Sequence, residues 1–413
     1  MLLEIKLWEK TVGALLYDIT TGKVIFQYDN NFVDNGLQIA PLLMPLIKNK
    51  EYIFSLADET YKNLPPVFAD SLPDKFGNTI LDTWLQQQGK TINQLNPVEK
   101  LTYIGKRGLG ALEYFPNVDQ ETNNKSIRVK DIVAIANEVL QQKTIPKSSL
   151  KNIFQISSSA GGARAKALIA INSVTNEILP GDIIYNNKQT SYYILKIDNN
   201  TPIKDYGKIE FIYYQMAKLA KIDFMPSKLY VENGNSHFLT ERFDRLNGEK
   251  IHMQTLCAIA KMDFNNPTVN SYEQAFRVIM QLNLNFIDTV QLYRRMIFNV
   301  LSRNVDDHTK NISFLMDKKG VWRLAPAYDL IYTLNTSTYW GKRHEMSVNG
   351  KRAKITIEDV LKIGKDLGIT NRKKIILEIV NAISQWEVLA KLQELPNKTM
   401  KAIETNLKYE SFE

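Results

Sequence analysis

Alternating apolar and polar positions open the chain and predict a β-meander over residues 1 to about 30. Turn residues such as Thr20, Thr21 and Gly22 separate the apolar runs. The expected strands are Leu3–Leu7, Val12–Tyr17 and Val24–Tyr28. An acid at position 4 within this alternation favours a first strand over a secretory signal peptide.

Helical spacing follows a stretch rich in proline and turn formers that ends at Gly77. A face made of Ile80, Leu81, Trp84 and Leu85 predicts an amphipathic helix. Residues 116–127 are then polar and form the best linker candidate, so we expect the first domain boundary there. A second amphipathic helix is predicted over residues 128–143.

Residues 150–245 read as a small mixed α/β lobe. It starts with a small, polar, flexible segment over residues 156–166. The strands and helix expected after it are Ala167–Ile171, Tyr192–Ile197, Ile209–Leu219 (the helix) and His237–Asp244.

Helical periodicity dominates from about residue 270. One long helix is predicted with a shared apolar face of Phe286, Val290, Tyr293, Ile297, Val300 and Leu301. A hairpin should follow, with strands Asn311–Leu315 and Val321–Leu324 around a Lys-Lys-Gly turn. Three further helices are expected at Ile357–Leu367, Lys373–Trp386 and Thr399–Leu407. A β-rich lobe followed by a mainly helical lobe is therefore the predicted organisation.

Composition excludes several classes of protein. An apolar content of 44 % and 10 % aromatics in 413 residues predict folded domains with full cores, not a disordered chain. The single cysteine, Cys257, excludes a disulfide framework or a cysteine-based zinc site within one chain, and favours a reducing cytoplasm. The four histidines are widely scattered, which gives a zinc hydrolase little support. No apolar run approaches the roughly 18 to 20 residues of a membrane span.

The net charge of +8 is modest for this length and fits a lysine-biased, solvated surface. Contact with nucleic acid or an acidic partner requires a localised basic patch. The cluster Arg372-Lys373-Lys374, with the lysines of residues 351–374, is a weak candidate for one.

Asp306, Asn311 and Asp329 form the constellation best suited to chemistry. Phosphoryl transfer from ATP needs a carboxylate that orients or deprotonates the attacking hydroxyl, and hard oxygen ligands for magnesium. The predicted hairpin would bring its two ends together, and with them these three side chains. The alternative is that they are loop residues that cap turns.

Two further segments could bind phosphate. Lys196 near the end of an apolar strand could pair with the α- and β-phosphates and be held by Glu210 on a helix, although most strand lysines simply face solvent. In the segment from Ser157 to Lys166, glycines would let backbone N–H groups approach phosphate, and Arg164 and Lys166 add charge. It matches neither the Walker fingerprint nor the eukaryotic kinase glycine loop, so a flexible surface loop is the alternative.

These features together resemble one known family. The chain is similar, over nearly its whole length and in order, to the HipA-like serine/threonine kinase toxins of bacterial toxin–antitoxin modules. The motifs that carry the resemblance are residues 67–74, 108–112, 159–166, 241–245, 252–254, 271–273, 304–311 and 328–329. The resemblance implies an α+β, two-lobed, protein-kinase-like fold with an extra N-terminal subdomain. The expected domains are residues 1–120, 121–250 and 251–413, the last dominated by helices.

The resemblance also implies roles for particular residues. Asp306 would be the catalytic aspartate, and Asn311 and Asp329 would hold Mg²⁺. The residues implied in nucleotide binding are Gly161, Gly162, Ala163, Arg164, Ala165, Lys166, Lys196, Glu241, Arg242, Phe243, His308, Lys310 and Asn311. Ser159 aligns with the family's autophosphorylated serine, and the neighbouring serines leave Ser157 as an alternative. A phosphate there would pair with nearby cations and move the loop away from ATP.

Family members phosphorylate aminoacyl-tRNA synthetases, usually glutamyl-tRNA synthetase, and so halt translation. A helix-turn-helix antitoxin that binds operator DNA neutralises them. The resemblance therefore implies ATP and Mg²⁺ as cofactors, and the antitoxin, operator DNA and a synthetase as partners. Two alternatives stay open: a catalytically weak corepressor scaffold, and a small-molecule kinase on a related fold.

Overall fold

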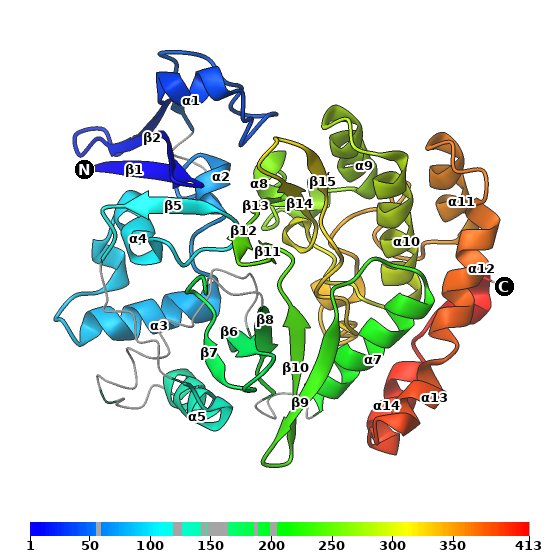
Figure 1. The fold of residues 1–413 in the computed structure, drawn as a ribbon. Coiled ribbons are helices and arrows are strands. Elements are labelled where there is room, and N and C mark those ends of the chain that lie inside the picture. Colours follow the sequence, from blue (N-terminus) through cyan, green and yellow to red (C-terminus); the bar gives the residue numbers. More distant parts are fainter. Residues whose placement is uncertain are drawn as a thin grey trace. The chain divides into compact units, whose positions relative to one another are not determined.

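The structure is a computed structural model that describes residues 1–54, 59–118, 126–141, 146, 164–185, 189–198 and 205–412. The chain divides into two compact units, whose elements are labelled in Figure 1. The first unit comprises Met1–Thr201, Tyr230–Gln254 and Leu315–Val321, and the second comprises Pro202–Leu229, Thr255–Phe314 and Trp322–Glu413. The three domains expected from the sequence, with boundaries near residues 120 and 250, stay a prediction.

The first unit begins with a five-stranded sheet of order β4-β3-β2-β1-β5. Its strands are β1 (Leu2–Leu7), β2 (Lys10–Tyr17), β3 (Val24–Tyr28), β4 (Glu51–Ile53) and β5 (Leu112–Phe115). Leu3, Ile5 and Leu7 alternate into the core with no exposed surface, as period-two alternation requires. The predicted meander is confirmed. In the described residues, four α-helices lie between β3 and β5 in the chain: α1 (Asn30–Asn35), α2 (Pro66–Ala69), α3 (Lys75–Gln86) and α4 (Pro97–Ile104).

A second five-stranded sheet has the order β7-β6-β8-β10-β9. Its strands are β6 (Lys166–Asn172), β7 (Ile178–Pro180), β8 (Thr190–Lys196), β9 (Ser227–Glu232) and β10 (Asn235–Glu241). The apolar faces of α3 and of α5 (Val129–Leu140) share one core with this sheet, in which Trp84, Ile132 and Leu195 are buried. Both predicted amphipathic helices are thus confirmed in the described residues, because the sheet covers their apolar faces.

The strand predicted over residues 237–244 is too long at its C-terminal end. β10 ends at Glu241, and the next residues turn aside because Arg242 and Asp244 bond to each other. Three further strands follow in the chain as β11 (Arg245–Leu246), β12 (Glu249–Lys250) and β13 (His252–Thr255).

Helices make up most of the second unit. They are α7 (Tyr206–Leu219), α8 (Leu256–Ile259), α9 (Tyr272–Gln281), α10 (Phe286–Ser302), α11 (Ile357–Asp366), α12 (Arg372–Ile383), α13 (Trp386–Leu392) and α14 (Asn397–Glu404). The long predicted helix is confirmed as α10, whose residues Leu292 to Ser302 are all buried. Phe286, expected on its packed face, is instead 56 % exposed because it occupies the first position of the helix.

The helix predicted over residues 373–386 is two helices, since α12 ends at Ile383 and α13 begins at Trp386. Between them the chain turns, and the Trp386 indole is buried and donates to the carbonyl oxygen of Met400 at 3.2 Å. The burial of this large side chain outweighs the continuation of a regular helix. In the described part of the chain, no helix is both long and apolar enough to cross a membrane.

Candidate active site in the second unit

The acidic loop, residues 304–311, begins where α10 ends. Arg303 adopts a left-handed backbone conformation with φ of 61° and so terminates the helix. Asn304 is buried, and its side-chain amide donates to Asn299 Oδ1 at 3.0 Å and to the carbonyl oxygen of Asp329 at 3.3 Å. The loop ends in the 3₁₀ helix η3 (Thr309–Asn311), so β14 (Ser313–Met316) starts two residues later than the sequence predicted.

The backbone of Asp306 is held from both sides. Thr333 Oγ1 accepts from the backbone N–H groups of Val305 at 2.8 Å and of Asp306 at 3.0 Å. The side-chain amide of Asn311 donates to the carbonyl oxygen of Asp306 at 2.9 Å. The Asp306 side chain itself keeps 59 % of its surface exposed. A fixed backbone with an accessible carboxylate is the arrangement that a positioned base requires.

Asp307 points the opposite way and anchors the loop. Its buried carboxylate accepts from the Tyr272 hydroxyl at 2.8 Å and from the backbone N–H of Glu345 at 2.8 Å, and it contacts His344 Nδ1 at 3.0 Å. The N–H of Glu345 also donates to the carbonyl oxygen of Val305 at 3.1 Å. The two adjacent aspartates therefore differ in function: Asp307 fixes the loop to α9 and to the 344–345 segment, and Asp306 faces outward.

The surroundings of Asp306 favour its protonated form. Packed neighbours remove part of the hydration of the Asp306 carboxyl and so raise its pKa, although one face of the side chain stays exposed. His308 lowers this pKa, and the carboxylates of Asp329 and Asp307 raise it. His308 Nε2 lies 3.9 Å from Asp306 Oδ1. A raised pKa makes this carboxylate a better proton acceptor than an ordinary aspartate. It also shows that Asp329 lies close enough for its charge to act on Asp306.

The donors here suit a magnesium ion that arrives with a nucleotide. Asp329 lies in the left-handed region with φ of 53°, which aspartate tolerates better than most residues. No group of three or more His, Cys, Asp or Glu side chains in the described residues is arranged to hold a metal ion. Mg²⁺ is commonly bound by only one or two carboxylates, completed by phosphates and water. A magnesium site of this kind would use Asn311 and Asp329 together with the phosphates of a bound nucleotide.

A small pocket lies beside the acidic loop, and most of its exposed wall is apolar. The space within it is about that of a single water molecule. Asp307, His308 and Asn311 line it together with Tyr272 and Tyr328. Lys310, expected near the γ-phosphate, places its ammonium group 4.5 Å from the centre of the Phe264 ring.

The remaining predicted nucleotide-binding residues that the structure describes belong to the first unit. Lys196 is the last residue of β8, with its ammonium group 5.8 Å from the Phe238 ring. Lys166 is buried in an ion pair with Asp74 at 3.1 Å, and Ala165 beside it is buried. Arg164 is partly exposed. Ser157, Ser159, Gly161, Gly162 and Ala163 lie outside the described residues.

The predicted hinge and the predicted lysine partner are also described. Glu241 accepts from the Tyr193 hydroxyl at 3.2 Å, and Arg242 is buried. Phe243 follows directly, where the chain leaves the sheet. Glu210 is buried on α7 in the second unit. Its pairing with Lys196 stays a prediction.

Comparison with known proteins places the chain in a family. A model of the HipA N-terminal domain matches residues 3–115, and a model of the HipA-like C-terminal domain matches residues 158–387. The second match alone covers more than half of the 413 residues. The chain belongs to the HipA-like family.

Two curated relatives match parts of this HipA-like chain. A protein from Sinorhizobium fredii, provisionally named as kinase Y4mE, is 25 % identical over 130 residues. That match covers 29 % of this chain and 31 % of the relative. A protein from Haemophilus influenzae, provisionally named as a kinase, is 32 % identical over 103 residues, which are 23 % of this chain and 30 % of the relative. The chain thus matches less than a third of the length of each.

A solved structure shows the same fold over the full length of the HipA-like chain. It describes the toxin–antitoxin system of HipA, HipB and its operator DNA from Shewanella oneidensis. One of its chains matches with a TM-score of 0.68 at 16 % identity, over 99 % of this chain and 95 % of that one. The predicted α+β, protein-kinase-like fold class is confirmed.

Several residues that shape this HipA-like site were missed by sequence reasoning. The acidic loop is contacted by Thr333, His344, Glu345 and Tyr272. These residues lie 27 or more positions from Asp306 in the chain, too far for spacing rules to connect them. The available signal is weak: Ser271-Tyr272-Glu273 is one of the motifs that resemble the family, but nothing in it predicts a role for the tyrosine. Their assembly depends on tertiary packing.

Replacing Glu345 with glutamine is expected to stabilise the protein at pH 8 by about 1–3 kcal/mol and to have little effect at pH 4.5. Burial raises the pKa of Glu345 from 4.5 to about 7, Arg352 opposes the shift, and Asp306 and Asp307 add to it. Because the pKa is higher in the folded state, the wild type loses stability as the pH rises from about 4.5 to 7, whereas glutamine cannot ionise.

Urea unfolding of both proteins at pH 4.5 and pH 8 measures this effect. The exposed Glu51→Gln substitution serves as the control and should leave the pH dependence unchanged. If the free energy of unfolding changed equally between pH 4.5 and pH 8 in Glu345→Gln and in the wild type, the ionised form of Glu345 would not be destabilised by its surroundings.

Proposed function

We propose that this protein is an ATP-dependent serine/threonine-protein kinase that acts as the toxin of a toxin–antitoxin module. The observation that carries this proposal is the accessible Asp306 carboxylate on a backbone fixed by Thr333 and Asn311, with Asp329 beside it. A positioned carboxylate of raised pKa and hard oxygen donors are the groups that phosphoryl transfer from ATP requires. Membership of the HipA-like family and the kinase names of its relatives support the same reaction.

Asp306 would orient the acceptor hydroxyl and take its proton as the oxygen attacks the γ-phosphorus. The bond from that phosphorus to the β,γ-bridging oxygen breaks, and ADP leaves. Bound Mg²⁺ would neutralise charge on the phosphates, with Asn311 and Asp329 as its protein ligands. His308 and Lys310 would lie beside the γ-phosphate.

In the first unit, the loop Gly161–Lys166 would cover the phosphates, and the backbone of Glu241–Phe243 would receive the adenine. Glu210 would hold Lys196 against the α- and β-phosphates. The loop's phosphorylated residue would be Ser159 or Ser157, which would switch the kinase off by moving the loop.

The proposed substrate is an aminoacyl-tRNA synthetase, with glutamyl-tRNA synthetase expected, and its phosphorylation would halt translation. The proposed partners are a helix-turn-helix antitoxin and, through it, operator DNA. The similar Shewanella oneidensis chain comes from a complex of HipA, HipB and operator DNA, which supports these partners. We propose a cytoplasmic location, where the synthetase and the operator are found.

The direct test combines purified protein, γ-labelled ATP, Mg²⁺ and glutamyl-tRNA synthetase. We expect the label to appear on a serine or threonine of the synthetase. We also expect growth to stop when the protein is expressed without its antitoxin. Phosphoproteomics of the arrested cells identifies the substrate if the synthetase is unlabelled. Arrest without any change in phosphoproteins would favour a small-molecule kinase. ATP-independent operator binding without any phosphate transfer would favour a corepressor scaffold.

Replacing Lys196 with methionine is expected to lower kcat/KM for ATP by about 100-fold, since a phosphate loses its charged hydrogen-bond partner. The methionine keeps an apolar stem of similar length, so the fold should survive. Steady-state kinetics at varied ATP concentration measures the change. The exposed Lys228→Met on β9 is the matched control. If Lys196→Met had the same kcat/KM for ATP as the wild type, Lys196 would not be part of the nucleotide site.

A further inference from the structure

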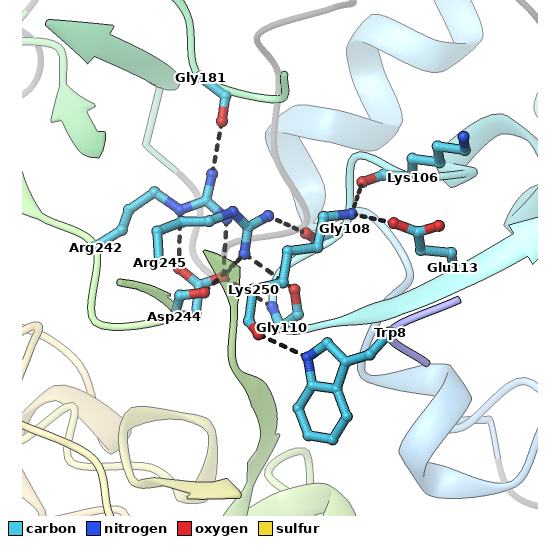
Figure 2. A network of polar contacts seen from close by, with 10 residues as sticks. All are labelled: Trp8, Lys106, Gly108, Gly110, Glu113, Gly181, Arg242, Asp244, Arg245 and Lys250. Atoms are coloured by element: carbon cyan, nitrogen blue, oxygen red, sulfur yellow. Dashed lines mark hydrogen bonds and ion pairs between the residues drawn. The ribbon is translucent and has the colours of Figure 1, made fainter. Parts of the chain in front are cut away.

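A largely buried polar network joins four segments of the first unit around the predicted nucleotide hinge (Figure 2). We call it the hinge network. Its members are Trp8, Lys106, Gly108, Gly110, Glu113, Gly181, Arg242, Asp244, Arg245 and Lys250.

Asp244 is the centre of the hinge network. Arg242 donates to both of its carboxylate oxygens, with Nε at 2.9 Å and Nη2 at 2.8 Å. Arg245 Nη1 and the backbone N–H of Gly110 each donate to Oδ2 at 2.8 Å. Burial alone would raise the pKa of Asp244, but the guanidinium groups of Arg242 and Arg245 outweigh it and hold this pKa well below its usual range. The carboxylate therefore stays ionised inside the protein.

The two arginines extend from Asp244 to different parts of the unit, as Figure 2 shows. Arg242 Nη1 donates to the carbonyl oxygen of Gly181, just after β7, at 3.0 Å. Arg245 donates to the carbonyl oxygens of Gly110 at 3.0 Å and Gly108 at 3.2 Å. The residues that follow β10 are thus tied both to the second sheet and to the segment that leads into β5.

Lys250 makes the second connection to the N-terminal sheet. Its ammonium group donates to Glu113 Oε1 on β5 at 2.8 Å and to the carbonyl oxygen of Lys106 at 2.6 Å. The carbonyl oxygen of Lys250 accepts from the Trp8 indole, next to β1, at 2.7 Å. Because Arg245 pairs with Lys250 in the β11–β12 hairpin, both connections converge on residues 242–250.

The stability of the fold does not by itself explain why Asp244, Arg242 and Arg245 form buried ion pairs. The side chains of Arg242 and Arg245 have no exposed surface and that of Asp244 has 3 %. Removing charges from water costs several kcal/mol per ion, and apolar replacements of buried ion pairs are often as stable. Directional bonds between ions do, however, fix the geometry of a backbone more narrowly than apolar packing does. The segment fixed here is the one that carries the predicted hinge, Glu241–Phe243.

We propose that Asp244 is a positioning residue for adenine nucleotides, and that the N-terminal sheet belongs through the hinge network to the nucleotide-binding apparatus. This inference rests on the proposed kinase function and deepens it. Asp244 acts through the hinge backbone and does not touch the nucleotide.

Replacing Asp244 with asparagine tests the inference, because it keeps the shape and removes the charge. The expected result is an increase of about tenfold or more in KM for ATP and in the Kd of a non-hydrolysable ATP analogue. At saturating ATP, kcat and the KM for the acceptor protein should stay within about twofold of wild type. The matched control is Glu249→Gln in the same hairpin, whose exposed ion pair with Lys318 lies outside the network. It should leave all these constants unchanged.

Glu113→Gln provides a second test from the N-terminal sheet, in case Asp244→Asn fails to fold. It should raise the Kd of the ATP analogue about threefold or more. The analogue should also protect the backbone amides of residues 241–243 from hydrogen exchange less than it does in the wild type. Thermal unfolding confirms that each variant is folded. A folded Glu113→Gln or Asp244→Asn protein with wild-type affinity for the analogue would overturn the inference. A wild-type protein that binds no ATP analogue would instead refute the proposed kinase function.

Discussion

Asp306→Ala is expected to lower phosphate transfer from ATP by about 100- to 10,000-fold, the usual range for removal of a general base. The acceptor hydroxyl then loses the only group proposed to take its proton. The fold should persist, because Asp306 is held through its backbone and its side chain is 59 % exposed. Steady-state transfer of label to glutamyl-tRNA synthetase and to the protein itself measures the loss. Growth arrest on expression should disappear with it.

The control for Asp306→Ala is Asp366→Asn, an exposed α11 residue paired with Lys362 at 3.2 Å. It should retain full activity and toxicity. Asp306→Asn adds a second comparison, since asparagine can orient a hydroxyl but cannot accept its proton. Toxicity that survives Asp306→Ala would show that the catalytic assignment is wrong. A separate measurement of ATP-analogue affinity should show little change, because Asp306 acts on the acceptor.

Asp329→Asn is expected to give the second large effect, a loss of activity of about 100-fold or more at millimolar Mg²⁺. An amide oxygen is a weaker magnesium ligand than a carboxylate, so the Mg²⁺ concentration for half-maximal activity should rise at least tenfold. Activity measured against magnesium concentration tests this shift. Asparagine also tolerates the left-handed backbone at this position, with φ of 53°, so folding should not suffer.

Asp317→Asn is a suitable control for Asp329→Asn, because the Asp317 carboxylate accepts from backbone N–H groups in the turn between β14 and β15 (Trp322–Leu324). It should leave the magnesium requirement unchanged. An unchanged magnesium requirement in Asp329→Asn would refute the proposed metal ligand. Recovery of Asp329→Asn activity at high Mg²⁺ would distinguish a weakened ligand from a misfolded site.

Local patterns predicted the regular elements well. Period-two alternation identified β1 to β3, and helical spacing identified α3, α5, α7 and α10, because each buries one face against a neighbour. The predicted element boundaries were wrong where tertiary packing overrides the periodicity of the sequence. Burial of Trp386 divides a predicted single helix, and the bonds of Arg242 end β10 early.

The sequence by itself determined the family and indicated the kind of chemistry that we propose. The spacing of Asp306, Asn311 and Asp329 around a hairpin indicated phosphoryl transfer, and ordered motifs indicated a HipA-like chain, which the family models then confirmed. Tertiary structure decided how the two adjacent aspartates differ. Tyr272, His344 and Glu345 surround Asp307 and leave Asp306 exposed, and they come from segments far apart in the chain. The same reason applies to the hinge network. Its bonds from Gly110 to Asp244 and from Lys250 to Glu113 join residues more than 130 positions apart, which only the folded chain brings together.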